Sequence, residues 1–156
     1  MTTERLLDEA NTMLDAAMAQ MDDHAHEYPI VPITLVCHTL QGHYMGLVLP
    51  SSENVAETIG DAIHHMTLHD GVQPLAWLLL MDTMLRHVNE VSGAEGDACE
   101  ALLVAIVSAD SDNDCMVTNR YQRMHGSLLW HEREFNYGPS TGVLPDVLRA
   151  SFAYRN

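Results

Sequence analysis

The sequence predicts a single α+β domain over residues 1–156, with a mainly antiparallel sheet of about five or six strands. Three observations lead to this fold class. An amphipathic helical segment begins the chain, runs of β-forming residues dominate the rest, and two further helical segments interrupt or follow those runs. At 156 residues and 47% apolar composition, the chain has enough material to bury a core.

Three segments have helical character. In the first, apolar residues recur at helical spacing from Leu6 to Met21, and Pro29 lies just beyond its end. The second covers residues 52–69, where Val55, Ile59 and Ile63 share one face and Gly71 follows as a cap. A short C-terminal helix is expected from Asp146 to Tyr154. We expect the helices to cover one face of the sheet.

The first two strands are predicted as a hairpin. Residues 32–40 and 43–49 are rich in β-formers, and Gln41-Gly42 between them can supply a turn with positive φ. Residues 73–88 fit either a buried strand or a helix, because leucine and methionine are frequent in them. The strand is the favoured interpretation.

A polar loop over residues 89–98 is expected to separate that segment from three successive strands. Residues 100–109 are too continuously apolar for a half-exposed strand, which predicts a central strand covered on both faces. Residues 115–124 alternate in polarity, residues 127–135 run back after a turn at His125-Gly126, and a loop over 136–145 leads to the last helix.

Charge excludes several function classes. The chain has no lysine, seven arginines and 22 carboxylates, for a formal net charge of −15. Lysine-dependent chemistry such as Schiff-base formation is therefore absent, and binding to nucleic acid is disfavoured because it needs a cationic surface. Residues 1–119 hold 19 of the carboxylates, whereas residues 120–156 hold five of the arginines. This asymmetry predicts an acidic face and a smaller arginine-bearing face, unless the charges simply face water.

Cysteine usage and hydropathy predict a cytoplasmic protein. Cys37, Cys99 and Cys115 are odd in number and widely spaced, which disfavours both a disulfide framework and a zinc-thiolate site. The N-terminus has no signal-peptide pattern, and no apolar run approaches the ~20 residues that a membrane helix needs.

The second half of the chain resembles a group of small uncharacterised α+β proteins of actinobacteria and their phages. The features that carry the resemblance are Glu100-Ala101-Leu102-Leu103-Val104, an acidic turn, a strand with Arg120 and Arg123, and Leu128-Leu129-Trp130-His131-Glu132 before a short leucine-bearing helix. They fall within residues 73–152. The resemblance implies no activity and no catalytic residue.

Histidine and aspartate patterns suggest two metal sites. Asp61, His65 and His69 recur every four residues of the predicted middle helix and could together bind zinc, although partly buried structural histidines are the commoner case. No HExxH pattern accompanies them. Asp110, Asp112 and Asp114 match the opening of a calcium loop.

Two positions of that loop depart from the calcium pattern. Cys115 stands where the loop needs glycine, and Tyr121 stands where it needs glutamate. A hairpin turn is therefore the favoured interpretation, and no bound cofactor is expected.

Two further groups of side chains are candidates. Cys37 could in principle pair with His43 across the hairpin turn, but a buried structural thiol is the commoner case. Arginine and tyrosine are enriched at interface hot spots, which makes a sheet surface with Tyr121 and three arginines a candidate contact patch. Those arginines are Arg120, Arg123 and Arg133.

The function that this sequence favours is binding without catalysis. We expect a small acidic protein-protein interaction module that self-associates or engages a basic partner surface, for example a phage-encoded modulator of a host protein. The alternative is a histidine-based metal-dependent enzyme or metal binder. A small-molecule pocket between sheet and helices is a third hypothesis.

Overall fold

The computed structural model describes residues 3–27, 31–42, 44–49, 54–88, 91–139 and 142–153. Its strands are β1 (Ile33–Thr39), β2 (Tyr44–Leu49), β3 (Pro74–Val88), β4 (Glu95–Ser108), β5 (Cys115–Met124), β6 (Ser127–Trp130) and β7 (Glu134–Tyr137). Its α-helices are α1 (Thr3–Asp23), α2 (Val55–His64) and α3 (Val143–Ala150). Short helical turns add η1 (Ala25–Glu27), η2 (His65–His69), η3 (Ser111–Asn113) and η4 (Ser151–Ala153).

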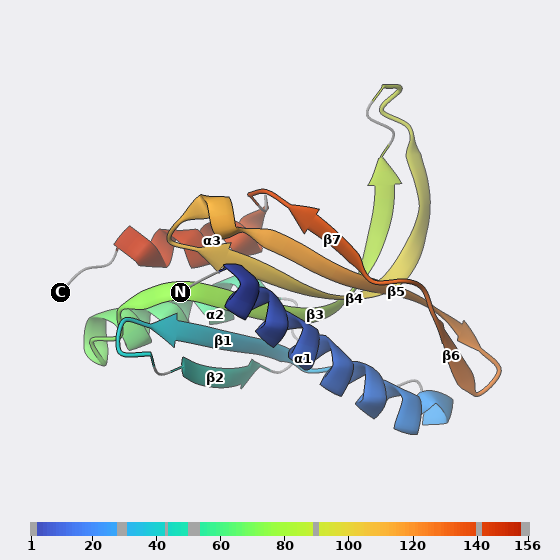
Figure 1. Ribbon diagram of the computed structural model, residues 1–156, viewed down its shortest axis with the longest axis horizontal. Coiled ribbons are helices and arrows are strands. Elements are labelled where there is room, and N and C mark those ends of the chain that lie inside the picture. The colour runs from blue at the N-terminus through green and yellow to red at the C-terminus, as the bar shows by residue number, and fades with distance from the viewer. Residues whose placement is uncertain are drawn as a thin grey trace.

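All seven strands belong to one sheet, ordered β2-β1-β3-β4-β5, with both β6 and β7 on the outer edge of β5 (Figure 1). Each pairing is antiparallel. This includes the pairing of β1 with β3, although β2 and α2 lie between these strands in the chain. The α+β class, the antiparallel sheet, the first hairpin and the three helices are confirmed. Residues 74–88 form a strand, as the favoured interpretation had it.

Helices cover both faces of the sheet, so the expectation of one covered face is wrong. Leu14 of α1 and Leu78 of β3 belong to the core on one face, whereas Ile63 of α2, Trp77 and Leu148 of α3 belong to the core on the other. Consecutive buried residues in β3 and β4 give the sheet two apolar faces, and each face must be removed from water. As predicted, β4 is central, and its residues 101–108 are all buried.

The predicted loop over residues 89–98 is also wrong in its extent. Strand β4 already begins at Glu95, and it continues the antiparallel ladder with β3 through the pair of Arg86 with Ala98. Backbone pairing with β3 outweighs the low β-propensity of this polar, glycine-containing segment.

The predicted strand over residues 127–135 is divided by a bulge. Trp130 pairs with Tyr121, but Glu134 pairs with Thr118, so three residues on one side face two on the other. The backbone N–H of His131 donates to the carbonyl of Arg120 at 2.8 Å within this bulge. Strand β7 then extends to Tyr137 and α3 begins at Val143, so the predicted loop over residues 136–145 is shorter than expected.

A two-stranded arm projects from the sheet (Figure 1). Beyond Leu80, β3 has no pairing with β1, and before Glu100, β4 has no pairing with β5, within the residues that the structure describes. We call residues 83–88 and 91–99 the β3–β4 arm. The side chains of Met84 and Val91 are 58% and 98% exposed on it.

Candidate functional site

A network of four polar side chains lies at the base of the β3–β4 arm. The hydroxyl of Tyr121, which is 1% exposed, donates to Oδ1 of Asp82 at 2.7 Å. Beside them, Nε of Arg123 donates to Oε1 of Glu100 at 3.0 Å, and its guanidinium lies 5.5 Å from the centroid of the Tyr121 ring. Four side chains from β3, β4 and β5 therefore hold one another in place.

Burial perturbs the protonation of this network. Desolvation raises the pKa of Asp82, although the hydrogen bond from Tyr121 and the charge of Arg123 work in the opposite direction. The pKa of Tyr121 is raised as well, first by burial and then by its bond to Asp82. Asp82, Glu100 and Arg123 line an open hollow of about 270 Å³ beside Met84. Perturbed titratable groups beside a hollow are typical of functional positions, and also of structural ion-pair networks.

The raised pKa of Asp82 predicts a pH-dependent cost to stability. A carboxyl with a higher pKa in the folded state binds protons more readily there, so the free energy of unfolding falls as pH rises from about 4 through that pKa. We expect Asp82→Asn, which keeps an oxygen acceptor for Tyr121, to remove this fall. The measurement is urea unfolding of both proteins over a pH series.

In that series, the stability of Asp82→Asn relative to the native protein should increase with pH and then level off. Asp97→Asn, an exposed carboxylate on the same arm, controls for the loss of one negative charge. A difference between Asp82→Asn and the native protein that stays constant over the whole series would contradict the prediction.

The structure separates the predicted contact patch of Tyr121, Arg120, Arg123 and Arg133. Only Tyr121 and Arg123 lie together, in the network above. Arg120 pairs with Glu134 at 3.4 Å. The side chain of Arg133, only 18% exposed, instead bonds to Asp15 and Asn11 of α1. The reason is the bulge at residues 131–133, which shifts the register between Arg120 and Arg133.

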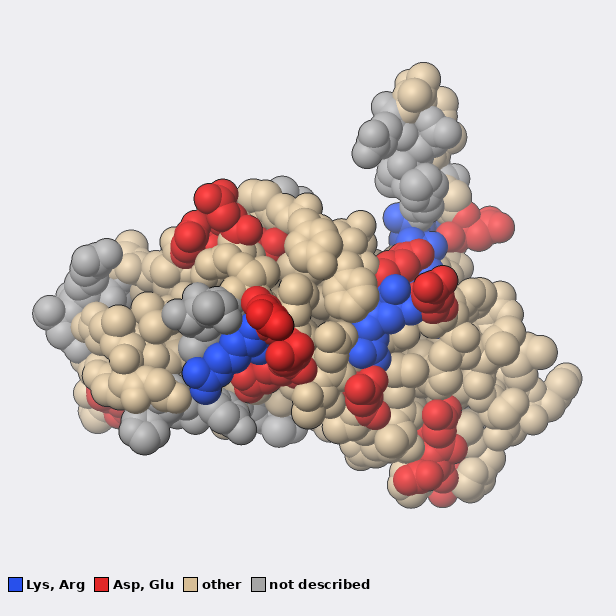
Figure 2. All heavy atoms as spheres, viewed as in Figure 1, with Lys and Arg blue, Asp and Glu red and all other residues tan. Residues whose placement is uncertain are grey.

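Three of the five arginines in residues 120–156 are paired with carboxylates from residues 1–119. Arg123 pairs with Glu100, Arg133 with Asp15 and Arg149 with Asp114. The predicted arginine-bearing face is therefore wrong, because the fold brings these guanidinium groups to acidic partners from residues 1–119. Figure 2 shows arginines flanked by carboxylates on the viewed face rather than gathered in a patch of their own.

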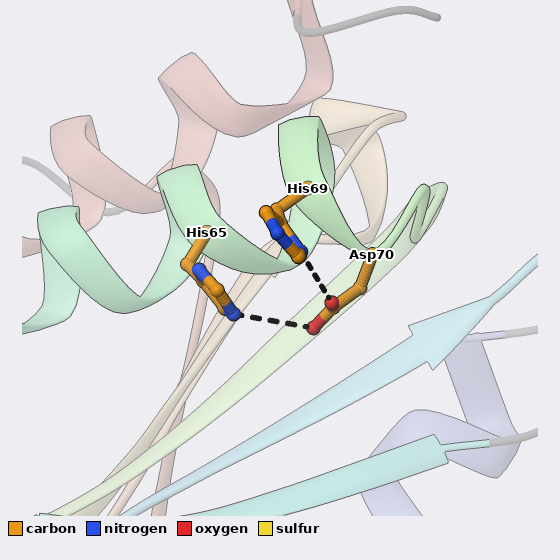
Figure 3. A group of neighbouring side chains, drawn as sticks. All are labelled: His65, His69 and Asp70. Carbon is orange, nitrogen blue, oxygen red and sulfur yellow. Dashed lines mark hydrogen bonds and ion pairs between the residues drawn. The ribbon is translucent and has the colours of Figure 1, made fainter.

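A second cluster lies at the end of the middle helix, where η2 follows α2. The imidazole rings of His65 and His69 stack with centroids 4.6 Å apart and an interplanar angle of 14°. The carboxylate of Asp70 lies 3.8 Å from Nε2 of His65 and 3.1 Å from Nδ1 of His69 (Figure 3). Predicted as the third ligand, Asp61 is not part of this convergence. Asp61 does line the same hollow as His65 and His69, although its carboxylate does not converge with their ring nitrogens.

The acidic turn and the Cys37 thiol have structural surroundings. Asp114 is buried, and its carboxylate accepts the backbone N–H of Ser108 at 2.7 Å and pairs with Arg149. Oδ1 of Asp110 accepts the N–H of Asp112 at 3.1 Å, as in a capped turn. Cys37 is fully buried, which raises the pKa of its thiol to about 12, while its suggested partner His43 lies outside the described residues.

A mainly apolar hollow of about 330 Å³ lies between α1 and β1. Its lining residues include Met13, Val31 and Leu80, with Gln20 and Thr34 as polar members. This hollow lies between the sheet and a helix, as the small-molecule hypothesis requires. Its volume is at the lower end of the range for ligand sites.

Sequence reasoning missed Asp82, Glu100 and Asp70. One signal was available for Asp82, which is the only charged residue between Pro74 and Leu85. Asp70 directly follows His69, but periodicity favoured Asp61 because positions four apart share a face of an α-helix. Nothing local in the sequence singles out Glu100.

Comparison with protein-family models, with curated proteins and with solved structures finds no match to this chain. Among the helices that the structure describes, none combines the length and the apolar character needed to cross a membrane.

Proposed function

We propose that this protein is a binding module without catalytic activity, and that its β3–β4 arm engages a cationic surface on a partner protein. The observation that carries the proposal is the arm itself. An isolated two-stranded ribbon is marginally stable in water, and a third strand, a helix or a partner normally supports it. Beyond the base of the arm, β3 and β4 pair only with each other in the described residues.

The arm has the composition of a contact surface. Its exposed apolar residues Met84 and Val91 accompany the half-buried Leu85. Exposed apolar side chains next to charged ones are typical of the centre and rim of protein interfaces. Binding there would remove apolar area from water and give the ribbon the cover that it lacks within its own chain.

Charge favours a basic partner over a second copy. Residues 82–100 contain five carboxylates and only one arginine, Arg86. Of these five, Glu100 pairs with Arg123 and Asp82 accepts a hydrogen bond from Tyr121. Glu90, Glu95 and Asp97 still give the sequence of residues 83–99 an excess of acid over Arg86. Two such arms repel each other, whereas a surface rich in arginine or lysine is attracted at long range.

The network of Asp82, Tyr121, Arg123 and Glu100 supports this role at the base of the arm. It ties both arm strands to β5 at the level where the pairing of β4 with β5 ends. A rigid base limits the conformational entropy that the arm loses on binding.

The test is direct binding of two fluorescent peptides, one of alternating leucine and arginine and one of alternating leucine and glutamate, measured by anisotropy. We expect the arginine peptide alone to bind, and its affinity to fall as salt rises. In an arm-shortened variant, Asn-Gly replaces residues 85–99. This variant should bind about tenfold or more weakly, as expected when the centre of an interface is lost.

Point variants make the test independent of the large deletion. Met84→Ser with Val91→Ser should weaken binding, whereas Met124→Ser with Leu129→Ser should not, because those two residues are exposed on the β5–β6 hairpin instead. Equal affinity of the native and arm-shortened proteins would refute the proposal. Light scattering on the same samples reports self-association, and a dimer that depends on the arm would identify a second copy as the occupant instead.

A further inference from the structure

Beyond the partner-binding role, we propose that His65, His69 and Asp70 form a surface site for a divalent transition metal of the zinc class. The three side chains come from the end of the middle helix, just before β3 begins, whereas the arm lies at the other end of β3. Within the residues that the structure describes, they are the one group of three histidine, cysteine or acidic side chains whose ligand atoms all lie within 4.8 Å of one another.

The geometry needs little adjustment to bind a metal. The Asp70 carboxylate already bridges the two imidazoles, with one oxygen 3.8 Å from His65 Nε2 and the other 3.1 Å from His69 Nδ1. Ligand atoms around tetrahedral zinc bond at about 2.0–2.2 Å, which places them about 3.3–3.5 Å from one another. Because an imidazole lone pair lies in its ring plane, the two stacked rings would also have to rotate out of their parallel arrangement, which their exposed positions permit.

The local backbone explains why these residues converge. The hydroxyl of Thr67 donates to the carbonyl of Ile63 at 2.7 Å, the oxygen that the N–H of Thr67 would bond to in a regular α-helix. The helix widens here into the π turn η2, in which the N–H of Asp70 donates to the carbonyl of His65 at 3.1 Å. Such turns occur frequently at functional sites.

A left-handed residue then ends the turn. Gly71 has φ +71°, and the N–H of Val72 reaches back to the carbonyl of Met66 at 2.9 Å. This reversal directly follows Asp70, whose carboxylate lies beside the nitrogen-bearing edges of the two rings (Figure 3).

The donor set selects the class of metal. Two imidazole nitrogens and one carboxylate oxygen suit zinc and its neighbours, whereas calcium and magnesium prefer oxygen ligands alone. Three protein ligands leave one tetrahedral position open, for water or a group from another molecule. The carboxylate of Asp61, which lines the same hollow, adds negative charge near the cation.

The chain contains a matched comparison. His24 and His26 each have a ring nitrogen 3.3 Å from the carboxylate of Glu27, so two histidines and one carboxylate are in contact there as well. Their ligand atoms do not converge as a set of three. Surface histidines that bind metal only by chance should therefore be found as readily at residues 24–27 as at residues 65–70.

The test is equilibrium dialysis of untagged protein against zinc ions alone, with metal content measured by elemental analysis. We expect one tight zinc per chain, and at least about tenfold weaker binding in His65→Gln, His69→Gln and Asp70→Asn, since even outer-shell partners contribute tenfold or more. The double variant His24→Gln/His26→Gln should bind zinc like the native protein.

A second readout uses cobalt, whose visible absorption reports the number and type of its ligands. A spectrum of four-coordinate cobalt should appear in the native protein and disappear in Asp70→Asn. Without metal, the two proteins should have the same melting temperature, because the three side chains are exposed. Zinc binding that is equal in native protein and His65→Gln, or that depends on His24 and His26, would overturn the proposal.

Discussion

Replacing Trp77 with alanine is expected to lower the free energy of unfolding by about 3–5 kcal/mol, the range for large aromatic side chains removed from a core. Trp77 is 0% exposed in β3 and belongs to the core beneath α2 and α3. Its indole N–H donates to the hydroxyl of Ser151 at 2.8 Å, so the variant loses a tie to the C-terminal helical segment as well as apolar contacts. Urea unfolding measures the loss.

Two controls separate the contributions of Trp77. Ser151→Ala removes the hydrogen-bond acceptor and should cost only about 1–3 kcal/mol, the range for a buried donor left unsatisfied. Trp77→Phe keeps most of the ring, and its cost should fall between those of the other two variants. A Trp77→Ala protein that unfolds at nearly the native urea concentration would show that Trp77 is not part of the core beneath α2 and α3.

Replacing Arg133 with leucine is expected to lower the free energy of unfolding by about 2–3 kcal/mol, mainly because a buried acceptor loses its charged donor. Arg133 donates to Oδ1 of Asn119 at 2.7 Å and to Oδ1 of Asn11 at 2.9 Å. Asn119 is buried, so its oxygen cannot turn to water. The pair with Asp15 adds little because that carboxylate is 70% exposed. Urea unfolding again gives the value.

The control for Arg133 is Arg120 of β5. Arg120→Leu breaks a more exposed ion pair with Glu134 and should cost less than about 1 kcal/mol. Arg133→Lys keeps the charge but not the forked donor geometry, so it should recover only part of the loss. If Arg120→Leu and Arg133→Leu are equally destabilising, the bulge does not have the role assigned to it.

Local patterns were sufficient to predict the elements of the fold. Helical spacing from Leu6 to Met21 located α1, and the continuous apolar run at residues 100–109 located a strand buried on both faces. A strand that is buried on both faces implies that both faces of the sheet are covered. The two-faced core follows once β3 is seen to be equally apolar.

The candidate sites were predicted less well, because they depend on register. Tyr121 and Arg123 were recognised, but their partner Asp82 lies 39 residues from Tyr121. Only the pairing of β3 with β4 and of β4 with β5 brings them into contact. Likewise, the sequence predicts Arg133 across the hairpin from Tyr121 and Arg123. Beyond the bulge at residues 131–133, its side chain instead meets Asn119 and α1.

The amino-acid sequence by itself determined the type and order of the elements, the excess of acid and the absence of lysine chemistry, since each follows from composition or from spacing within one element. The tertiary structure alone decided which carboxylate each arginine meets, that Asp70 rather than Asp61 joins His65 and His69, and that β3 and β4 extend as an arm. These outcomes depend on strand register, a bulge and a π turn. Register and the bulge arise when distant segments pack together, and a one-residue shift changes every contact that follows it. The π turn is local, but it departs from the regular α-helical spacing on which a sequence pattern depends.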